Sequence, residues 1–284
     1  MDDVARVRPS DLPQLDRCRR RFVRTVTGSG LTHGPSTHSR RRFALANAVV
    51  DAARRAHAQA ESEGVAPSEI LDDTAPPRDL EAEERAVFDD AMAGYGDVAD
   101  ARGGRPVDPA PDAFPARTSR SGRFKLSVTI DVALVVDGIT EVRRLAFGPS
   151  PHGRLADDPR ARLTALVCGG TEPLRYVHVD VLRASASVVD TDAEERRRWG
   201  DELGPRIISA LDEPEPAATP GPWCSSCPAV RGCPAIGASD LASPLSSAER
   251  GGPGTGERPG TDEAPGASES PTTGGSRGAA GMGG

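Results

Sequence analysis

The sequence predicts a mixed α/β domain in which helices pack on a small sheet. Every second residue from 124 to 136 is apolar, and this period of two is typical of a half-buried strand. Asp137-Gly138 then forms a two-residue hairpin turn, and residues 139–147 return as the partner strand. Helical periodicity lies on both sides of this hairpin, so helices and strands belong to the same domain.

Helices flank the hairpin along the chain. Residues 7–23 are predicted to form a short lead and a helix with Ser10 at its N-cap. Prolines mark the segments 61–80 and 102–119 as loops. The remaining elements are predicted, in chain order, as helices at 37–58 and 80–94, the hairpin, a helix at 157–169, a strand at 175–183 and a helix at 190–211.

Composition divides the 284 residues into two parts. Residues 237–284 consist of glycine, serine, proline, alanine, threonine and charged residues, with almost no large apolar side chain. Such a segment buries too little apolar surface to offset the entropy of ordering it, so a disordered tail is predicted. Residues 1–236 are long enough for one α/β domain with its own core.

The chain is predicted to be cytoplasmic and to have no membrane partner. Its apolar runs are shorter than the roughly 18 residues of a membrane span. Its first residues, Met1-Asp2-Asp3-Val4, lack the basic region and apolar core of a secretory signal. Its five cysteines fit a reducing compartment and a metal site better than a disulfide framework.

Four of the cysteines form a pattern typical of a metal or cluster site. Cys224, Cys227 and Cys233 lie in a C-x2-C-x5-C-P stretch, and Cys18 lies near the other end of the chain. Four thiolates are the usual ligands of a tetrahedral zinc ion or an iron–sulfur cluster. Such a site would tie the N-terminus to the C-terminal end of the domain. Cys168, at the end of a predicted helix, is expected in the core instead.

A basic segment lies on an otherwise acidic chain, whose net charge is −7. Residues 17–42 contain several arginines and no acidic residue. These arginines are expected either to contact nucleic-acid phosphates or to form a solvated helix face. The candidate nucleic-acid contacts are Arg19, Arg20, Arg21, Arg40, Arg41 and Arg42.

Several of these features occur together in one nuclease family. The stretch from Ser10-Asp11-Leu12 to Cys18-Arg19-Arg20-Arg21-Phe22 is similar to its opening segment, although Arg19 stands where the family has proline. Gly34 and His38 are similar to its G-x3-H at the head of a helix. With the hairpin and the cysteine pattern, residues 7–236 resemble the RecB-type nucleases of the PD-(D/E)XK superfamily, in the subgroup with a four-cysteine iron–sulfur clasp.

The resemblance implies a restriction-endonuclease-like core, which is a small mixed sheet with flanking helices. It implies that a 4Fe–4S cluster, with zinc as the alternative, closes this core through Cys18, Cys224, Cys227 and Cys233. It also implies that Asp131, on the first hairpin strand, and His38 bind Mg²⁺ or Mn²⁺ for phosphodiester cleavage. An acid and a lysine, two residues apart, should follow on the second strand.

The second hairpin strand departs from this family pattern. The two-residue turn pairs Asp131 with Arg144, so arginine stands at the acid position and Ala146 at the lysine position. We therefore expect an ion pair between Asp131 and Arg144. Glu141 could serve as the acid only if a bulge turned it to the face of Asp131. Lys125, the only lysine in the chain, is too far along its strand to replace the missing lysine.

Three functions remain as alternatives. The first is a metal-dependent DNA exonuclease or endonuclease of recombination or repair, against which Arg144 and Ala146 both weigh. The second is a non-catalytic relative that binds DNA or acts as a scaffold beside a helicase or another repair-complex subunit. The third is a zinc-binding interaction module that is unrelated to nucleases.

Overall fold

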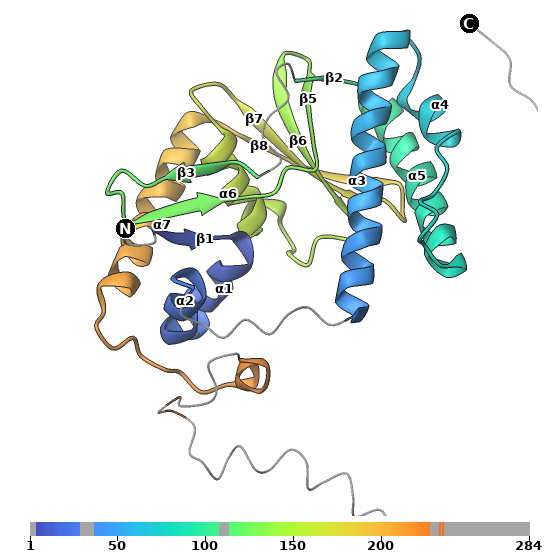
Figure 1. Ribbon diagram of the computed structural model, residues 1–284. Coiled ribbons are helices and arrows are strands. Elements are labelled where there is room, and N and C mark those ends of the chain that lie inside the picture. Colours follow the sequence, from blue (N-terminus) through green and yellow to red (C-terminus); the bar gives the residue numbers. More distant parts are fainter. Residues whose placement is uncertain (1–3, 29–36, 108–113, 228–232, 234, 236–284) are drawn as a thin grey trace, which may run out of the picture. The chain divides into compact units, whose positions relative to one another are not determined.

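The computed structural model contains two mixed β-sheets with flanking helices, which confirms the predicted mixed α/β class (Figure 1). The structure describes residues 4–28, 37–107, 114–227, 233 and 235, without the side chains of residues 37–39, 225 and 226. The predicted tail at 237–284 lies outside the described residues. None of the described helices is both long and apolar enough to cross a membrane.

The larger sheet has five strands in the order β2-β5-β6-β7-β8. Strands β6 and β7 run parallel, and the other neighbouring pairs are antiparallel. Because parallel neighbours need a crossover, helix α6 (Pro159–Cys168) lies between β6 and β7 in the chain. The strands span Arg105–Pro106 (β2), Val132–Val136 (β5), Ile139–Ala146 (β6), Leu174–Asp180 (β7) and Ser185–Thr191 (β8).

The predicted hairpin turn is confirmed between β5 and β6. Asp137 and Gly138 both have positive φ, 53° and 78°, as a type I′ turn requires. This turn pairs Val136 with Ile139, and the register continues without a bulge to Val132 opposite Arg143. The face of every residue on β6 is therefore set by the turn.

The smaller sheet has three strands, β1 (Ala5–Val7), β4 (Phe124–Ser127) and β3 (Ala116–Thr118), in the order β1-β4-β3. The prediction of one continuous strand over 124–136 is wrong, because the chain leaves this sheet after β4 and enters the larger sheet at β5. Between them, Arg54 donates from Nε to the carbonyl oxygen of Asp131 at 2.6 Å and from Nη2 to that of Ile130. A guanidinium thus satisfies carbonyl groups that a strand partner would otherwise bind.

Helices cover both faces of the larger sheet (Figure 1). On one face α3 contacts β5 and β6 while α5 contacts β7 and β8, and α6 packs against β7 from the other face. The helices are α1 (Leu12–Arg17), α2 (Arg19–Val26), α3 (Thr37–Glu63), α4 (Pro67–Asp72), α5 (Ala82–Arg102), α6 and α7 (Ala193–Asp212), with 3-10 turns at Pro9–Asp11 (η1), Leu155–Asp157 (η2) and Pro222–Ser226 (η3).

Other stretches also differ from the predicted elements. The segments 61–80 and 102–119, predicted as loops, contain helix α4 and strands β2 and β3 respectively. The helix expected over 7–23 is broken, because Cys18 has an extended backbone (φ −160°, ψ 100°) between α1 and α2. Strand β8 occupies the predicted start of the last helix. That helix begins instead after Asp192, whose side chain accepts a hydrogen bond from the Glu195 amide at 2.7 Å.

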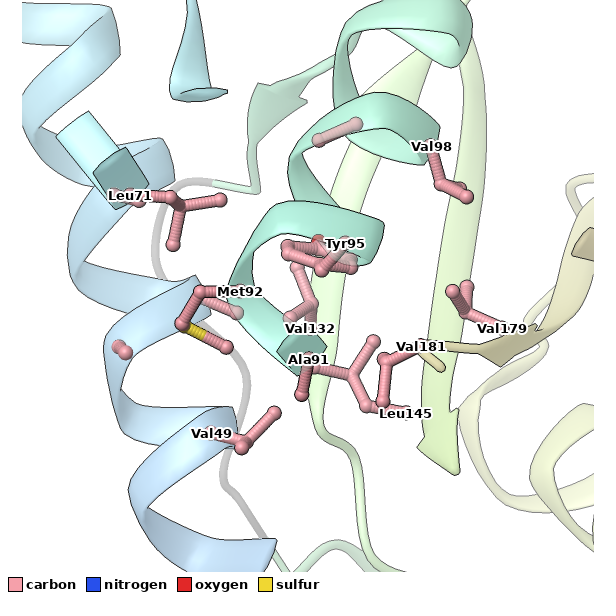
Figure 2. Packing of buried hydrophobic residues seen from close by; sticks show 14 of the residues in the cluster. Val49, Leu71, Ala91, Met92, Tyr95, Val98, Val132, Leu145, Val179 and Val181 are labelled. Atoms are coloured by element: carbon pink, nitrogen blue, oxygen red, sulfur yellow. The ribbon is translucent and has the colours of Figure 1, made fainter. Parts of the chain in front are cut away.

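The main core lies between the larger sheet and helices α3 and α5. Figure 2 shows Met92 and Tyr95 of α5 near Val132 and Leu145 of the sheet, and these four side chains are between 0% and 4% exposed. Burying one large apolar side chain contributes roughly 1.5–3 kcal/mol. A separate cluster on the other face includes Val142, with residues of α6 and α7.

Gly94 marks a close approach between α5 and the turn after β7. A methyl group on its Cα would collide with the carbonyl oxygen of Val181. We predict that Gly94→Ala lowers the free energy of unfolding by about 2–3 kcal/mol, because the helix must shift to make room. Urea unfolding measures the loss.

Gly200→Ala in α7 is the matched control for this prediction. Its Cβ would meet only Cδ2 of Leu166, at 3.6 Å, so the higher helix propensity of alanine should raise stability by up to about 1 kcal/mol. Equal stabilities of the two variants would contradict the close approach at Gly94.

Candidate functional site

Strand β6 presents different side chains to the two faces of the larger sheet. Val142 packs with α6 and α7, and Arg144, two residues later, shares that face. Glu141 and Arg143 lie on the opposite face with Leu145, which packs in the core under α3 and α5. Each face therefore carries its own buried polar groups.

Asp131 and Arg144 form the predicted ion pair. Nη1 of Arg144 donates to both carboxylate oxygens of Asp131, at 2.8 and 2.6 Å. The Leu145 amide donates to the same carboxylate at 2.8 Å. Asp131 is 1% exposed and the Arg144 side chain is 28% exposed, so the guanidinium connects a buried charge to solvent.

This arrangement does not fit a divalent metal site. Mg²⁺ needs carboxylate or other oxygens around it, but both oxygens of Asp131 already accept from a cation. Arg144 contacts Asp131 directly, and Ala146 offers no ligand atom. Lys125 lies on β4 of the other sheet. His38 lies in the first turn of α3, and its side chain is outside the described part.

Glu141 lies on the face opposite to the Asp131–Arg144 pair. It pairs with Leu134 in a regular register, so the bulge that would turn it toward Asp131 does not occur between residues 132–136 and 139–143. Its side chain is fully buried and accepts from Arg143 Nε at 2.7 Å and from Arg102 Nη2 at 2.5 Å. Glu141 is therefore the centre of a buried arginine network and is not placed to share a metal ion with Asp131.

The same network shifts several pKa values. Burial alone raises the pKa of Glu141, but hydrogen bonds from Arg102 and Arg143 outweigh burial, so the net shift is downward. His57 lies nearby and its Nε2 is 2.8 Å from the Tyr95 hydroxyl. Burial, with Arg143 close by, lowers the pKa of His57 to about 4, and burial raises that of Tyr95 to about 12. Both groups are neutral at pH 7.

The four candidate cluster cysteines occupy two regions that contact each other. Cys18 is buried between α1 and α2, whereas Cys224, Cys227 and Cys233 are partly exposed. Arg21, one turn after Cys18, donates to the carbonyl oxygen of Trp223 at 3.0 Å, beside Cys224. Among the described residues, however, no three histidine, cysteine or acidic side chains converge to hold a metal ion. Cys168 packs against the core as predicted, and burial raises its pKa to about 12.

The six candidate DNA-contacting arginines of the basic segment lie on two helices. On α2, Arg19 pairs with Glu213 at 3.4 Å, the Arg20 amide donates to Ala217, and Arg21 bonds Trp223, so these residues hold the C-terminal link. On α3, Arg41 pairs with Glu81. Arg40 and Arg42 are exposed.

The structure also forms an arginine-lined cavity of about 410 Å³. Its lining includes Arg6, Arg8, Arg144 and Arg160, and no acidic residue is among the described residues that line it. Arg143 also borders it, but its buried guanidinium is bound to Glu141 on the other face of the sheet. Sequence reasoning missed this site because the arginines come from β1, β6 and α6, which are far apart in the chain. No single stretch of sequence signals it.

Comparisons with known proteins add little to this geometry. No family model matches the chain. No curated protein matches it either. One solved structure, described as "Crystal structure of SSO0001", is 12% identical, covers 83% of this chain and 88% of its own, and has a TM-score of 0.36. That likeness is too distant to carry an argument about fold or function.

The buried His57 predicts a pH-dependent loss of stability. Its pKa is 6.5 when exposed and about 4 in the folded protein, so the unfolded chain binds the extra proton between these values. The contribution of neutral His57 to the free energy of unfolding should be fully present above about pH 6.5. The free energy of unfolding should then fall by up to about 3 kcal/mol as the pH approaches 4. His57→Gln should remove this contribution, which urea unfolding across pH 4–7 measures.

His152→Gln, at a partly exposed position, is the control for this measurement. It should keep the pH dependence of the unsubstituted protein. If His57→Gln keeps it as well, the loss of stability comes from other groups and the prediction is wrong.

Proposed function

We propose that this protein is a catalytically degenerate relative of the RecB-type PD-(D/E)XK nucleases that binds DNA in recombination or repair. The contact of Arg144 with both carboxylate oxygens of Asp131 is the observation that carries the proposal. In the family pattern this place belongs to two carboxylates and a metal ion. Here a guanidinium stands in the place of the cation and of the second acid.

The chemistry of the remaining groups supports a binding role over a catalytic one. Metal-assisted hydrolysis needs oxygen ligands that converge on one cation and activate a water molecule. Asp131 and Glu141 lie on opposite faces, and each is already neutralised by arginine. Arginine remains protonated and is a poor general base, so neither Arg143 nor Arg144 replaces the family lysine.

We further propose that Cys18, Cys224, Cys227 and Cys233 bind a 4Fe–4S cluster, with zinc as the alternative. The hydrogen bond between Arg21 and Trp223 supports this assignment, because it brings the segments around Cys18 and Cys224 together. The amide of Cys227 also donates to the carbonyl oxygen of Cys224 at 3.1 Å, in a turn that suits a C-x2-C pair. The cluster would hold the chain ends and would leave cleavage to a partner, such as a helicase-associated or other repair-complex subunit.

The proposal predicts DNA binding without metal-dependent cleavage. At low salt the protein should bind DNA, and affinity should fall steeply as salt rises, because phosphate contacts release counterions. Incubation with Mg²⁺ or Mn²⁺ should leave single- and double-stranded DNA intact, as denaturing gels would show. Asp131→Asn, which keeps an acceptor for the Leu145 amide, is the control.

Two outcomes would overturn this proposal. One is metal-dependent cleavage that Asp131→Asn abolishes, which would assign the carboxylate a catalytic role. The other is the absence of DNA binding at low salt, which would remove the proposed function.

Metal content tests the cluster separately. Protein purified without oxygen should be brown and contain about four irons per chain. Cys224→Ser should lose the iron, whereas Cys168→Ser, at a partly buried core position, should retain it. Colourless protein with one tightly bound zinc would instead support the zinc alternative, and the absence of both metals would exclude a metal site at these cysteines.

A further inference from the structure

We infer that the arginine-lined cavity binds a phosphate of single-stranded DNA while an adjacent base stacks on Phe43 at its rim. This inference rests on the proposed DNA binding and names the site and the form of DNA that it takes. The argument combines the charge of the cavity, an unpartnered hydroxyl in its wall and exposed aromatic rings beside it.

The charge of the cavity favours an anion. Arg6, Arg8 and Arg160 line it, are exposed, and form no ion pair with any carboxylate in the described part of the chain. Arg144 uses only Nη1 for Asp131, so its Nε and Nη2 donors have no acceptor among the described groups. Guanidinium groups match phosphate geometry and bind it through charge-assisted hydrogen bonds.

The wall of the cavity contains an unused donor. Tyr176 on β7 lines the cavity and is 2% exposed, and its hydroxyl is buried without a hydrogen-bond partner in the described structure. Burial raises the pKa of Tyr176, so the hydroxyl keeps its proton. An unsatisfied buried hydroxyl costs free energy, which a hydrogen bond from this hydroxyl to an anion would offset.

Three carboxylates lie near the cavity, and each is already engaged. Asp11 is 5% exposed and accepts from the Arg8 amide at 2.8 Å. Asp131 is bound by Arg144. Asp158 caps α6 by accepting from the Arg160 amide at 2.8 Å, and it is 3% exposed. These contacts leave the side chains of Arg6, Arg8, Arg144 and Arg160 as the charged groups that line the cavity.

The rim indicates that the anion belongs to single-stranded nucleic acid. Phe43 on α3 and Phe114 both line the cavity, with 62% and 69% of each residue exposed. An exposed aromatic ring beside arginines is the usual platform for an unpaired base. Paired bases in a duplex keep their faces stacked, and a cavity of about 410 Å³ suits a ligand of small-molecule size.

Fluorescence anisotropy with a labelled single-stranded DNA oligonucleotide tests the inference. Arg160→Ala should weaken binding about fivefold or more and reduce the slope of log affinity against log salt by about 0.7, the value for one phosphate contact on a single strand. Phe43→Ala should weaken binding about fivefold or more without changing that slope. Tyr176→Phe should weaken binding in the same direction as Arg160→Ala by removing only the hydroxyl.

Matched substitutions elsewhere separate this site from general effects of charge and apolar surface. Arg197→Ala removes an exposed arginine from a different cavity, and Leu182→Ala removes an exposed apolar side chain from the turn after β7. Both should stay within about twofold of the unsubstituted protein. An abasic oligonucleotide of the same length should bind more weakly to Arg160→Ala, as the DNA does. Its affinity should not change with Phe43→Ala.

The outcomes distinguish this inference from the proposed function. If the oligonucleotide binds but Arg160→Ala behaves like Arg197→Ala, or Phe43→Ala like Leu182→Ala, the cavity is not the site although DNA binding stands. Tighter binding of duplex DNA with no Phe43 effect would also overturn the inference. If neither form of DNA binds at low salt, the proposed function itself fails.

Discussion

The ion pair of Asp131 and Arg144 stabilises the junction between the two sheets. Asp131 lies where the chain passes from the smaller sheet to the larger one, and its carboxylate binds Arg144 and the Leu145 amide while its carbonyl oxygen binds Arg54. A carboxylate that is 1% exposed would be strongly destabilising without such partners. The contacts that stabilise the bend between β4 and β5 therefore also occupy both carboxylate oxygens of Asp131. These oxygens are then not available to bind a metal ion.

The alternation of side chains along β6 explains why the two candidate acids, Asp131 and Glu141, do not form one site. A regular two-residue turn puts Arg144 on the face of Asp131 and puts Glu141 on the other face, beneath α3 and α5. On that face Glu141 is neutralised by Arg102 and Arg143. Moving Glu141 to the other face would need a bulge, and it would also leave these buried guanidinium groups without their carboxylate.

The hairpin was predictable because the residues that specify it are adjacent in the sequence. Asp137-Gly138 specifies the turn, the turn specifies the register up to Val132 opposite Arg143, and the next residues along, Asp131 and Arg144, form the ion pair. The break of the strand at 128–131 was not predictable, because the apolar alternation continues through it. The guanidinium that stabilises the break belongs to Arg54, more than 70 residues earlier in the chain.

Strand β8 was missed for another reason: it is an edge strand whose residues are mostly exposed, so it has no apolar alternation to detect. The arginine-lined cavity depends on contacts between distant segments and has no local signal.

Under the proposed relationship, Arg144 stands where the nucleases have an acid, and this difference would change what the surface can hold. A pair of carboxylates neutralises a phosphate through a bound cation, whereas a guanidinium neutralises it directly through its own N–H donors. Asp131 occupies one nitrogen of Arg144, and the other donors remain beside Arg160 and the buried hydroxyl of Tyr176. The proposed contact with phosphate therefore needs no bound cation, and the carboxylates of Asp131 and Glu141 lie on opposite faces. If the proposed function is correct, the absence of cleavage and the direct recognition of phosphate would both follow from Arg144.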